Sequence, residues 1–227
     1  MLRISILLLI ILPSGVFAID SLKWDYSKYK DYNYKSFFDS RYARQKIRFD
    51  YIDYPLLHAA IFYETNRQRV LNGLPPFMHS PSLEKAAHEH SIDMVAYGFF
   101  SHTSVVEGKE TMSKRFAKVG IKNAYTGENI ADFSAIEYQP GKSVFAPPQN
   151  GGYFSYTYQG KPIGNHIYMS AAKALLKQWM NSPGHRKNIL NTKFKYLGVG
   201  AAYFEEESFH NMPYFKATQN FASVCGS

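Results

Sequence analysis

The spacing of apolar residues changes along the chain, and this change constrains the fold more than any other feature. Apolar residues recur every three to four positions in four stretches, which predicts helices over residues 55–72, 82–97, 111–119 and 168–180. Three other stretches read as strands, over residues 127–133, 196–204 and 214–223. Because helices come first and strands last, the sequence predicts an α+β fold and not a repeating βαβ array.

The last two predicted strands carry further information about packing. Gly198 and Gly200 lie inside the strand at 196–204, which indicates that another segment approaches that backbone closely. On the final strand the alternation places four residues on one inward face, namely Phe215, Ala217, Gln219 and Phe221.

Residues 134–165 carry four prolines and five glycines, too many for regular core structure. Within them, residues 153–158 alternate aromatic and small side chains, and the triplet Gly160-Lys161-Pro162 follows. We therefore expect a hairpin inside a long surface insertion.

The first 18 residues have the layout of a secretory signal peptide. Arg3 precedes an apolar run of Ile and Leu that is too short to span a bilayer, and Val16 and Ala18 supply small residues before a cleavage point. No later apolar run reaches the length of a membrane anchor. We therefore expect a secreted or periplasmic protein that begins at Ile19 after cleavage.

Charge and cysteine content narrow the class of protein. The formal charge is +8, but basic residues alternate with Asp and Tyr, so we expect no nucleic-acid partner. The surface is either simply basic and soluble or meets an anionic cell-surface polymer. A single cysteine, Cys225, excludes an internal disulfide framework, so stability must come from burial or from bound ligands. We expect a monomer.

Residues 19–54 form a segment rich in rings, because eleven of these 36 residues are aromatic. Such a segment cannot build a core of its own, since large rings need partner surfaces. We expect an arm that drapes over the main domain, or tethers it. Exposed Tyr and Trp rings that stack on sugars are the alternative.

Three short patches carry the strongest functional signal: residues 99–102 (FFSH), 127–130 (GENI) and 181–190 (NSPGHRKNIL). Together with Asn66-Arg67, Leu197-Gly198-Val199-Gly200 and Thr218-Gln219-Asn220-Phe221, they resemble the CAP superfamily of cysteine-rich secretory, antigen 5 and pathogenesis-related 1 proteins, in its exported bacterial form. The resemblance covers residues 55–223.

This resemblance implies an α-β-α sandwich with a central antiparallel sheet and a cleft. Two histidines and two acidic residues line that cleft, and some members bind a divalent metal such as zinc there. By position, His102, Glu128 and His185 match three members of the tetrad, whereas the place of the fourth acid falls near Ser182, which is not acidic. Gln219, on the inward face of its strand, and Asn66, which the helical spacing of residues 55–72 places facing inward, are further candidates to line the cleft.

Two imidazoles and one carboxylate make an open ligand set that leaves a fourth zinc position for water. The pair Ser182-Pro183 is typical of a helix start, which would put His185 at the third helical position, where the positive helix terminus disfavours imidazolium. His102 and His185 are therefore the candidate metal ligands. The alternative is that both histidines only hold loops through hydrogen bonds to the backbone.

Other candidates are weaker. His88 and His90 are two apart on a helix and face different sides, so they cannot chelate together. We expect His90 and Trp179 to be core residues, and Glu84 with His88 to be an exposed pair. Nucleophile motifs such as Gly-x-Ser-x-Gly are absent.

Three functions remain open at this point. The first is a non-catalytic exported module that binds a lipid, a glycan or a peptide in the cleft, with or without metal. The second is a zinc-assisted hydrolase of peptide or cell-wall bonds, in which Glu128 is a ligand or the general base. The third is a structural envelope protein that adheres through its aromatic arm.

Overall fold

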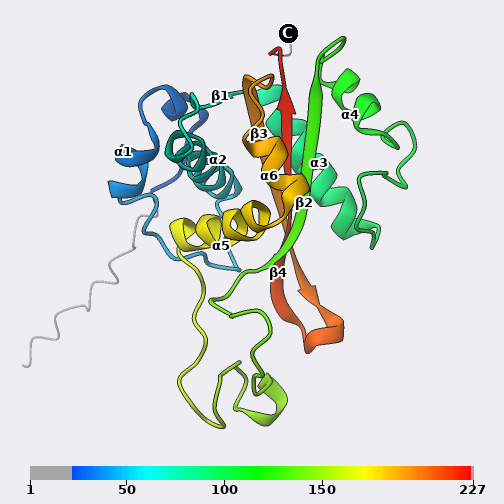
Figure 1. Ribbon diagram of the computed structural model, residues 1–227. Coiled ribbons are helices and arrows are strands. Elements are labelled where there is room, and N and C mark those ends of the chain that lie inside the picture. Colours follow the sequence, from blue (N-terminus) through cyan, green and yellow to red (C-terminus); the bar gives the residue numbers. More distant parts are fainter. Residues whose placement is uncertain (1–21, 226–227) are drawn as a thin grey trace, which may run out of the picture.

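A computed structural model describes residues 22–225 of the chain (Figure 1). The expected signal peptide, residues 1–18, lies outside the described residues. None of the helices in the described part is long and apolar enough to cross a membrane. The elements follow in this order: η1 (Tyr26–Lys30), α1 (Tyr34–Asp39), α2 (Tyr54–Leu71), β1 (Met78–His79), α3 (Pro81–Ala96), α4 (Met112–Lys118), β2 (Thr126–Ser134), η2 (Pro147–Gln149), α5 (Tyr168–Asn181), α6 (Pro183–Ile189), β3 (Tyr196–Glu206), η3 (Glu207–Phe209) and β4 (Met212–Ala222).

The helices start where local side chains satisfy the first free backbone N–H groups. The Asp53 carboxylate accepts from Leu56 N at the start of α2, and the Ser80 hydroxyl accepts from Leu83 N at the start of α3. Such caps contribute about 1 kcal/mol each. The four helices expected from apolar spacing are confirmed as α2, α3, α4 and α5, with shifts of one or two residues at their ends.

Four strands form one sheet in the order β1-β3-β4-β2. β4 pairs antiparallel with both β3 and β2, so the three predicted strands are confirmed. β1, however, pairs parallel with β3, so the sheet is mixed and not wholly antiparallel as expected. β1 has only two residues, and alternation cannot mark so short a strand.

Helices cover both faces of this sheet (Figure 1). α2, α5 and α6 lie on one face, over the inward side chains Phe215, Ala217, Gln219 and Phe221, which are all fully buried. α3 and α4 lie on the other face. This α-β-α layering agrees with the expected sandwich.

Glycines let α3 approach the sheet very closely. A Cβ on Gly198 would lie 2.0 Å from Glu84 N, and one on Gly200 would lie 2.1 Å from His88 N. Both neighbours are helix backbone, which cannot rotate away as a flexible side chain would. The expectation of a close backbone approach at these glycines is therefore confirmed.

The aromatic arm packs against α2. The rings of Trp24 and Phe37 are buried in the main core, with Ala43 and Ile47. Trp24 N also donates to the Asp53 carboxylate at 3.0 Å, which ties the arm to the residue that caps α2. Two short helices in the arm, η1 and α1, were not predicted from sequence because their apolar residues lack a helical period.

The hairpin expected in the insertion after β2 is present only in minimal form, as one antiparallel bridge between Ser155 and Pro162 that is closed by a turn at residues 157–160. Residues 153–158 form no strand, and Ser155 makes only isolated bridges, to Phe145 and to Pro162. Proline has no N–H to extend such a ladder, and the neighbouring glycines favour turns. The insertion instead packs Ile136, Ala146 and Phe154 around Met212 at the β3–β4 end of the sheet.

The glycine contacts yield a stability prediction. We expect Gly200→Ala to lower the free energy of unfolding by about 1–3 kcal/mol or more, because the added methyl group overlaps the backbone of α3. Gly164→Ala is the matched control, since nothing lies within 4 Å of the place its methyl group would take and its φ is not in the left-handed region. Urea unfolding measures both. Equal midpoints for the two variants would contradict the close contact.

Candidate functional site

Three different elements bring His102, Glu128 and His185 to one place. His102 lies in the loop after α3, Glu128 on the edge strand β2, and His185 in the first turn of α6. His102 Nδ1 lies 2.8 Å from Glu128 Oε1. The side chain of Asn129, the residue after Glu128 on β2, donates to His185 O at 3.2 Å.

Glu128 is a buried carboxylate held by a fixed cation. Arg115, from α4, donates from one nitrogen to both oxygens of Glu128, at 2.9 and 2.7 Å, and both side chains are 2% exposed. With its nitrogen turned toward the carboxylate, the Asn220 amide donates to Glu128 Oε2 at 3.1 Å. Arg115 also donates to the backbone carbonyl of His102, which fixes the loop that carries this histidine.

These partners decide the protonation of Glu128. Burial alone would raise its pKa, but the hydrogen bond to His102 and the charge of Arg115 outweigh burial, so the pKa lies below its usual value. An ionised Glu128 can only accept hydrogen bonds. His102 therefore donates through Nδ1–H, so in a neutral His102 ring the lone pair is on Nε2. The ring is 56% exposed.

His185 occupies the third position of α6, as expected from Pro183. Ser182 precedes this helix, but its side chain makes no capping hydrogen bond. Burial, and then repulsion from His102, lower the pKa of His185, so its imidazole is neutral at pH 7. Its Nδ1 is buried and has no hydrogen-bond partner among the described residues.

The backbone of α6 is fixed to the edge of the sheet. Asn188 donates to Glu128 O at 3.2 Å and to Asn129 Oδ1 at 2.8 Å. Asn129 in turn donates to His185 O at 3.2 Å. These bonds hold the helix that carries His185 against the strand that carries Glu128.

Two other candidate residues lie elsewhere. Gln219 is fully buried between Asn129 and Thr65, so it supports the site from the core and does not line a cleft. Asn66 bonds the backbone of Phe77 beside β1, near the edge of the sheet opposite β2. Alternation and helical spacing gave the inward direction of both residues correctly, but they do not specify which part of the interior each one reaches.

The donor set fits a divalent cation only in part. Both oxygens of Glu128 are engaged by Arg115, so this carboxylate does not fit as a third ligand. Among residues 22–225 no group of three or more His, Cys, Asp or Glu side chains is placed to hold a metal. His102 Nε2 and the His185 ring remain as the two nitrogen donors, with Glu128 orienting the His102 ring through Nδ1, as carboxylates commonly do for metal-binding histidines.

Sequence reasoning missed the partners of Glu128. Arg115 is one of several basic residues in α4, and only its burial sets it apart from Lys114 and Lys118. The signal that was available is the position of Asn220 in the matched patch at 218–221. His90 is a buried core histidine as expected, with Nε2 bonded to Ser101 O. Trp179 is likewise fully buried.

The expectation that Glu84 and His88 form an exposed pair is wrong. Glu84 is buried and bonds His58 Nδ1 at 2.9 Å, His79 Nε2 at 2.5 Å and Tyr29 Oη at 3.2 Å. His58 Nε2 accepts from Ala201 N, so His58 donates to Glu84 through Nδ1–H. Burial would raise the pKa of Glu84, but the two histidine hydrogen bonds lower it to about 2.

Comparison with known proteins identifies one family. The profile described as cysteine-rich secretory protein family, CAP, matches residues 62–225. YkwD of Bacillus subtilis (strain 168), an uncharacterized protein, is 33% identical over 137 residues, which are 60% of this chain and 38% of YkwD. YlbC of the same strain, an uncharacterized membrane protein, is 29% identical over 136 residues, 60% of this chain and 29% of YlbC.

A solved structure gives the same result. The crystal structure of an extracellular protein containing a SCP domain, from Bacillus anthracis str. Ames, superposes with a TM-score of 0.50 and 26% sequence identity. The match covers 76% of this chain and 42% of that protein. The chain thus matches less than half of the length of each of these relatives.

The buried ion pair yields the second prediction. Arg115→Met leaves the Glu128 charge buried without its cation, so we expect a loss of about 3–5 kcal/mol in the free energy of unfolding at pH 7. Lys114→Met is the control, because Lys114 is 56% exposed and its pair with Glu110 contributes about 0–1 kcal/mol.

The pH dependence of this loss follows from Glu128. In the native protein the lowered pKa of Glu128 adds stability above the unfolded pKa of about 4.3, and this stability is lost as the pH falls through the folded pKa. In the variant, burial raises the pKa of Glu128, so the penalty is largest at neutral pH and shrinks in acid. A penalty that is the same at pH 7 and pH 4 would contradict this account.

Proposed function

Because this chain belongs to the cysteine-rich secretory protein family, CAP, we propose that it is a non-catalytic binding module that acts outside the cytoplasm. The ligand is held at His102 and His185. The observation that carries the proposal is the pairing of a solvent-exposed imidazole with a neutral, partly buried one whose Nδ1 lacks a partner among the described residues. An unsatisfied buried polar atom at the edge of a site is costly unless a ligand satisfies it.

A location outside the cytoplasm is supported from two sides. The solved relative from Bacillus anthracis is described as an extracellular protein. The first 18 residues of this chain have the composition of a secretory signal peptide. A single cysteine is compatible with an oxidising compartment, since no disulfide framework has to form there.

A divalent cation such as zinc would be held by His102 Nε2 and a ring nitrogen of His185. When bound, the ion supplies a Lewis-acidic contact for an oxygen atom of the ligand. Glu128 accepts from His102 Nδ1–H, which leaves Nε2 of the neutral ring free to bind the ion, and Arg115 holds Glu128 in place. Both histidines must be neutral to bind, and the lowered pKa of His185 keeps that ring neutral below the usual pH range of imidazole.

Binding fits this geometry better than hydrolysis. A general base must accept a proton from water, but Glu128 has a lowered pKa and accepts hydrogen bonds from Arg115 and His102 on both oxygens. The hydrolase alternative would need Arg115 to leave Glu128. The carboxylate is thus placed to orient an imidazole and not to remove a proton.

Calorimetric titration with ZnCl₂ on metal-stripped protein at pH 7.5 tests the proposal. We expect binding at micromolar or lower concentration that is lost in the double variant His102→Ala/His185→Ala and retained in His210→Ala, which removes an exposed histidine from the η3–β4 turn. A folded native protein that binds no zinc, or a double variant that binds as tightly, would reject the cation-held site.

An activity measurement separates binding from hydrolysis. We expect no cleavage by the zinc-loaded protein in a panel of peptides and peptidoglycan fragments. Cleavage that is lost in Glu128→Gln would show instead that Glu128 takes part in catalysis, and the hydrolase would replace the binding module.

A further inference from the structure

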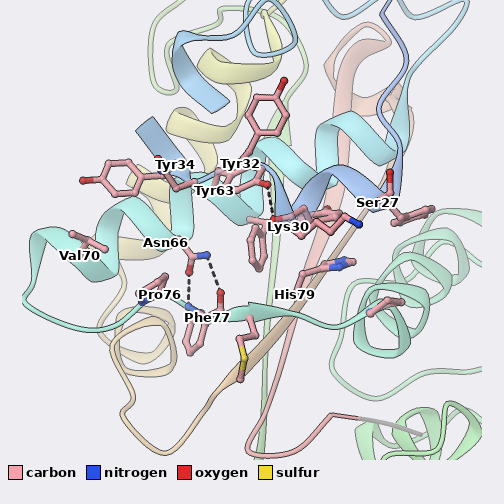
Figure 2. A pocket seen from close by; sticks show the side chains of 16 residues that line it. Ser27, Lys30, Tyr32, Tyr34, Tyr63, Asn66, Val70, Pro76, Phe77 and His79 are labelled. Atoms are coloured by element: carbon pink, nitrogen blue, oxygen red, sulfur yellow. Dashed lines mark hydrogen bonds between the residues drawn. The ribbon is translucent and has the colours of Figure 1, made fainter. Parts of the chain in front are cut away.

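A concave site lies at the edge of the sheet opposite to Glu128, where the arm meets the domain. A cavity of about 670 Å³ opens between η1 and the residues after it, α2, and the segment that forms β1 (Figure 2). Its lining is mostly apolar, and Tyr26, Val70 and Met78 in it are exposed hydrophobic side chains. Lys30 is the only Lys, Arg, Asp or Glu of the described chain that lines it.

One wall of this cavity is the free edge of the sheet. β1 is the terminal strand and pairs with β3 in parallel. Met78 N donates to Lys195 O at 2.9 Å and Ser80 N donates to Leu197 O at 3.1 Å, so these residues face β3. The backbone groups of the alternate residues, Phe77 and His79, therefore face away from the sheet.

The outward groups of Phe77 already have a partner. The Asn66 side chain accepts from Phe77 N at 2.7 Å and donates to Phe77 O at 3.1 Å (Figure 2). The Asn66 amide thus replaces the peptide group of a neighbouring strand as the hydrogen-bond partner of the Phe77 backbone. No described residue forms a hydrogen bond with the backbone N–H or C=O of His79, the next outward residue.

The neighbouring side chains keep this edge in place. The Tyr29 ring stacks on the His79 ring with centroids 3.6 Å apart, and His79 Nε2 bonds the buried Glu84. The conformation of His79 is therefore set before any ligand arrives. A preorganised edge loses little conformational entropy when a partner binds.

We infer that this cavity is a binding groove for an extended peptide segment that carries an acidic side chain. The peptide main chain pairs with the N–H and C=O of His79, as in recognition by strand addition. Its apolar side chains lie against Tyr26, Val70 and Met78, and its carboxylate lies near Lys30. The proposal is independent of the site formed by His102, Glu128 and His185.

Titration of ¹⁵N-labelled protein with one synthetic peptide, acetyl-Glu-Val-Thr-Val-Thr-Val-Glu-amide, tests the groove. Glutamate at both ends allows either strand direction. We expect shifts centred on the His79 amide and on residues 26–34, with weaker binding of the matched peptide that has lysine at both ends. Two further analogues carry N-methyl groups on alternate residues, one on the odd-numbered residues and one on the even-numbered residues. Each analogue lacks the N–H donors of one edge of the peptide, so at least one of the two must lose binding.

Protein variants separate this site from the first one. We expect Lys30→Glu to change the ratio of the two peptide affinities by about fivefold in favour of the lysine peptide. This change corresponds to the energy of one exposed ion pair. Lys35→Glu is the control, because Lys35 is on the same arm but does not line the cavity. His102→Ala/His185→Ala should bind the peptide as the native protein does, whatever its zinc affinity.

Several results would overturn the inference. They are no shifts at millimolar peptide, shifts centred away from His79, or equal binding of both N-methylated registers. The fourth result is that a tetramer of N-acetylglucosamine shifts the resonances of residues 26–34 and the peptide does not. That result would show that the exposed rings bind a glycan.

Discussion

The close approach of α3 to β3 sets the geometry of both sites. Helix backbone lies within 2.0–2.3 Å of where the Cβ atoms of Gly198 and Gly200 would be, so α3 lies closer to the sheet than side chains at these two positions would allow. Its first turn carries Glu84 toward β1 and the arm, and its end leads into the loop that carries His102. A shift of this one helix would displace the contacts of Glu84 with His58 and His79 together with that of His102 with Glu128.

The two buried carboxylates illustrate two ways to keep a charge inside a protein. Glu128 pairs with a guanidinium that is as buried as itself, and the histidine beside it is left facing solvent. Glu84 instead pairs with two imidazoles and a tyrosine hydroxyl, and one of those imidazoles, His58, is fixed in its tautomer by a backbone N–H. A buried charge is costly without such partners, and each set of partners also fixes the surface next to it.

The arm contributes a surface as well as packing. Trp24 and Phe37 fill the core beside α2, while Tyr26 and Lys30 remain at the rim of a cavity. The family match begins at residue 62, so the arm lies outside it. The cavity at β1 therefore combines a wall from the family domain with a wall that belongs to this chain's own N-terminal segment.

The sequence by itself determined the longer elements and the family. The apolar periods gave four helices and three strands, and the patches at 99–102, 127–130 and 181–190 gave the CAP resemblance, because both signals depend on residues close together in the chain. Tertiary structure alone decided the partners: Arg115 for Glu128, His58 and His79 for Glu84, and the parallel pairing of β1. Side-chain direction along an element is a local property, but the group a side chain meets depends on how distant elements pack, so Gln219 and Asn66 pointed inward as expected and reached other parts of the interior.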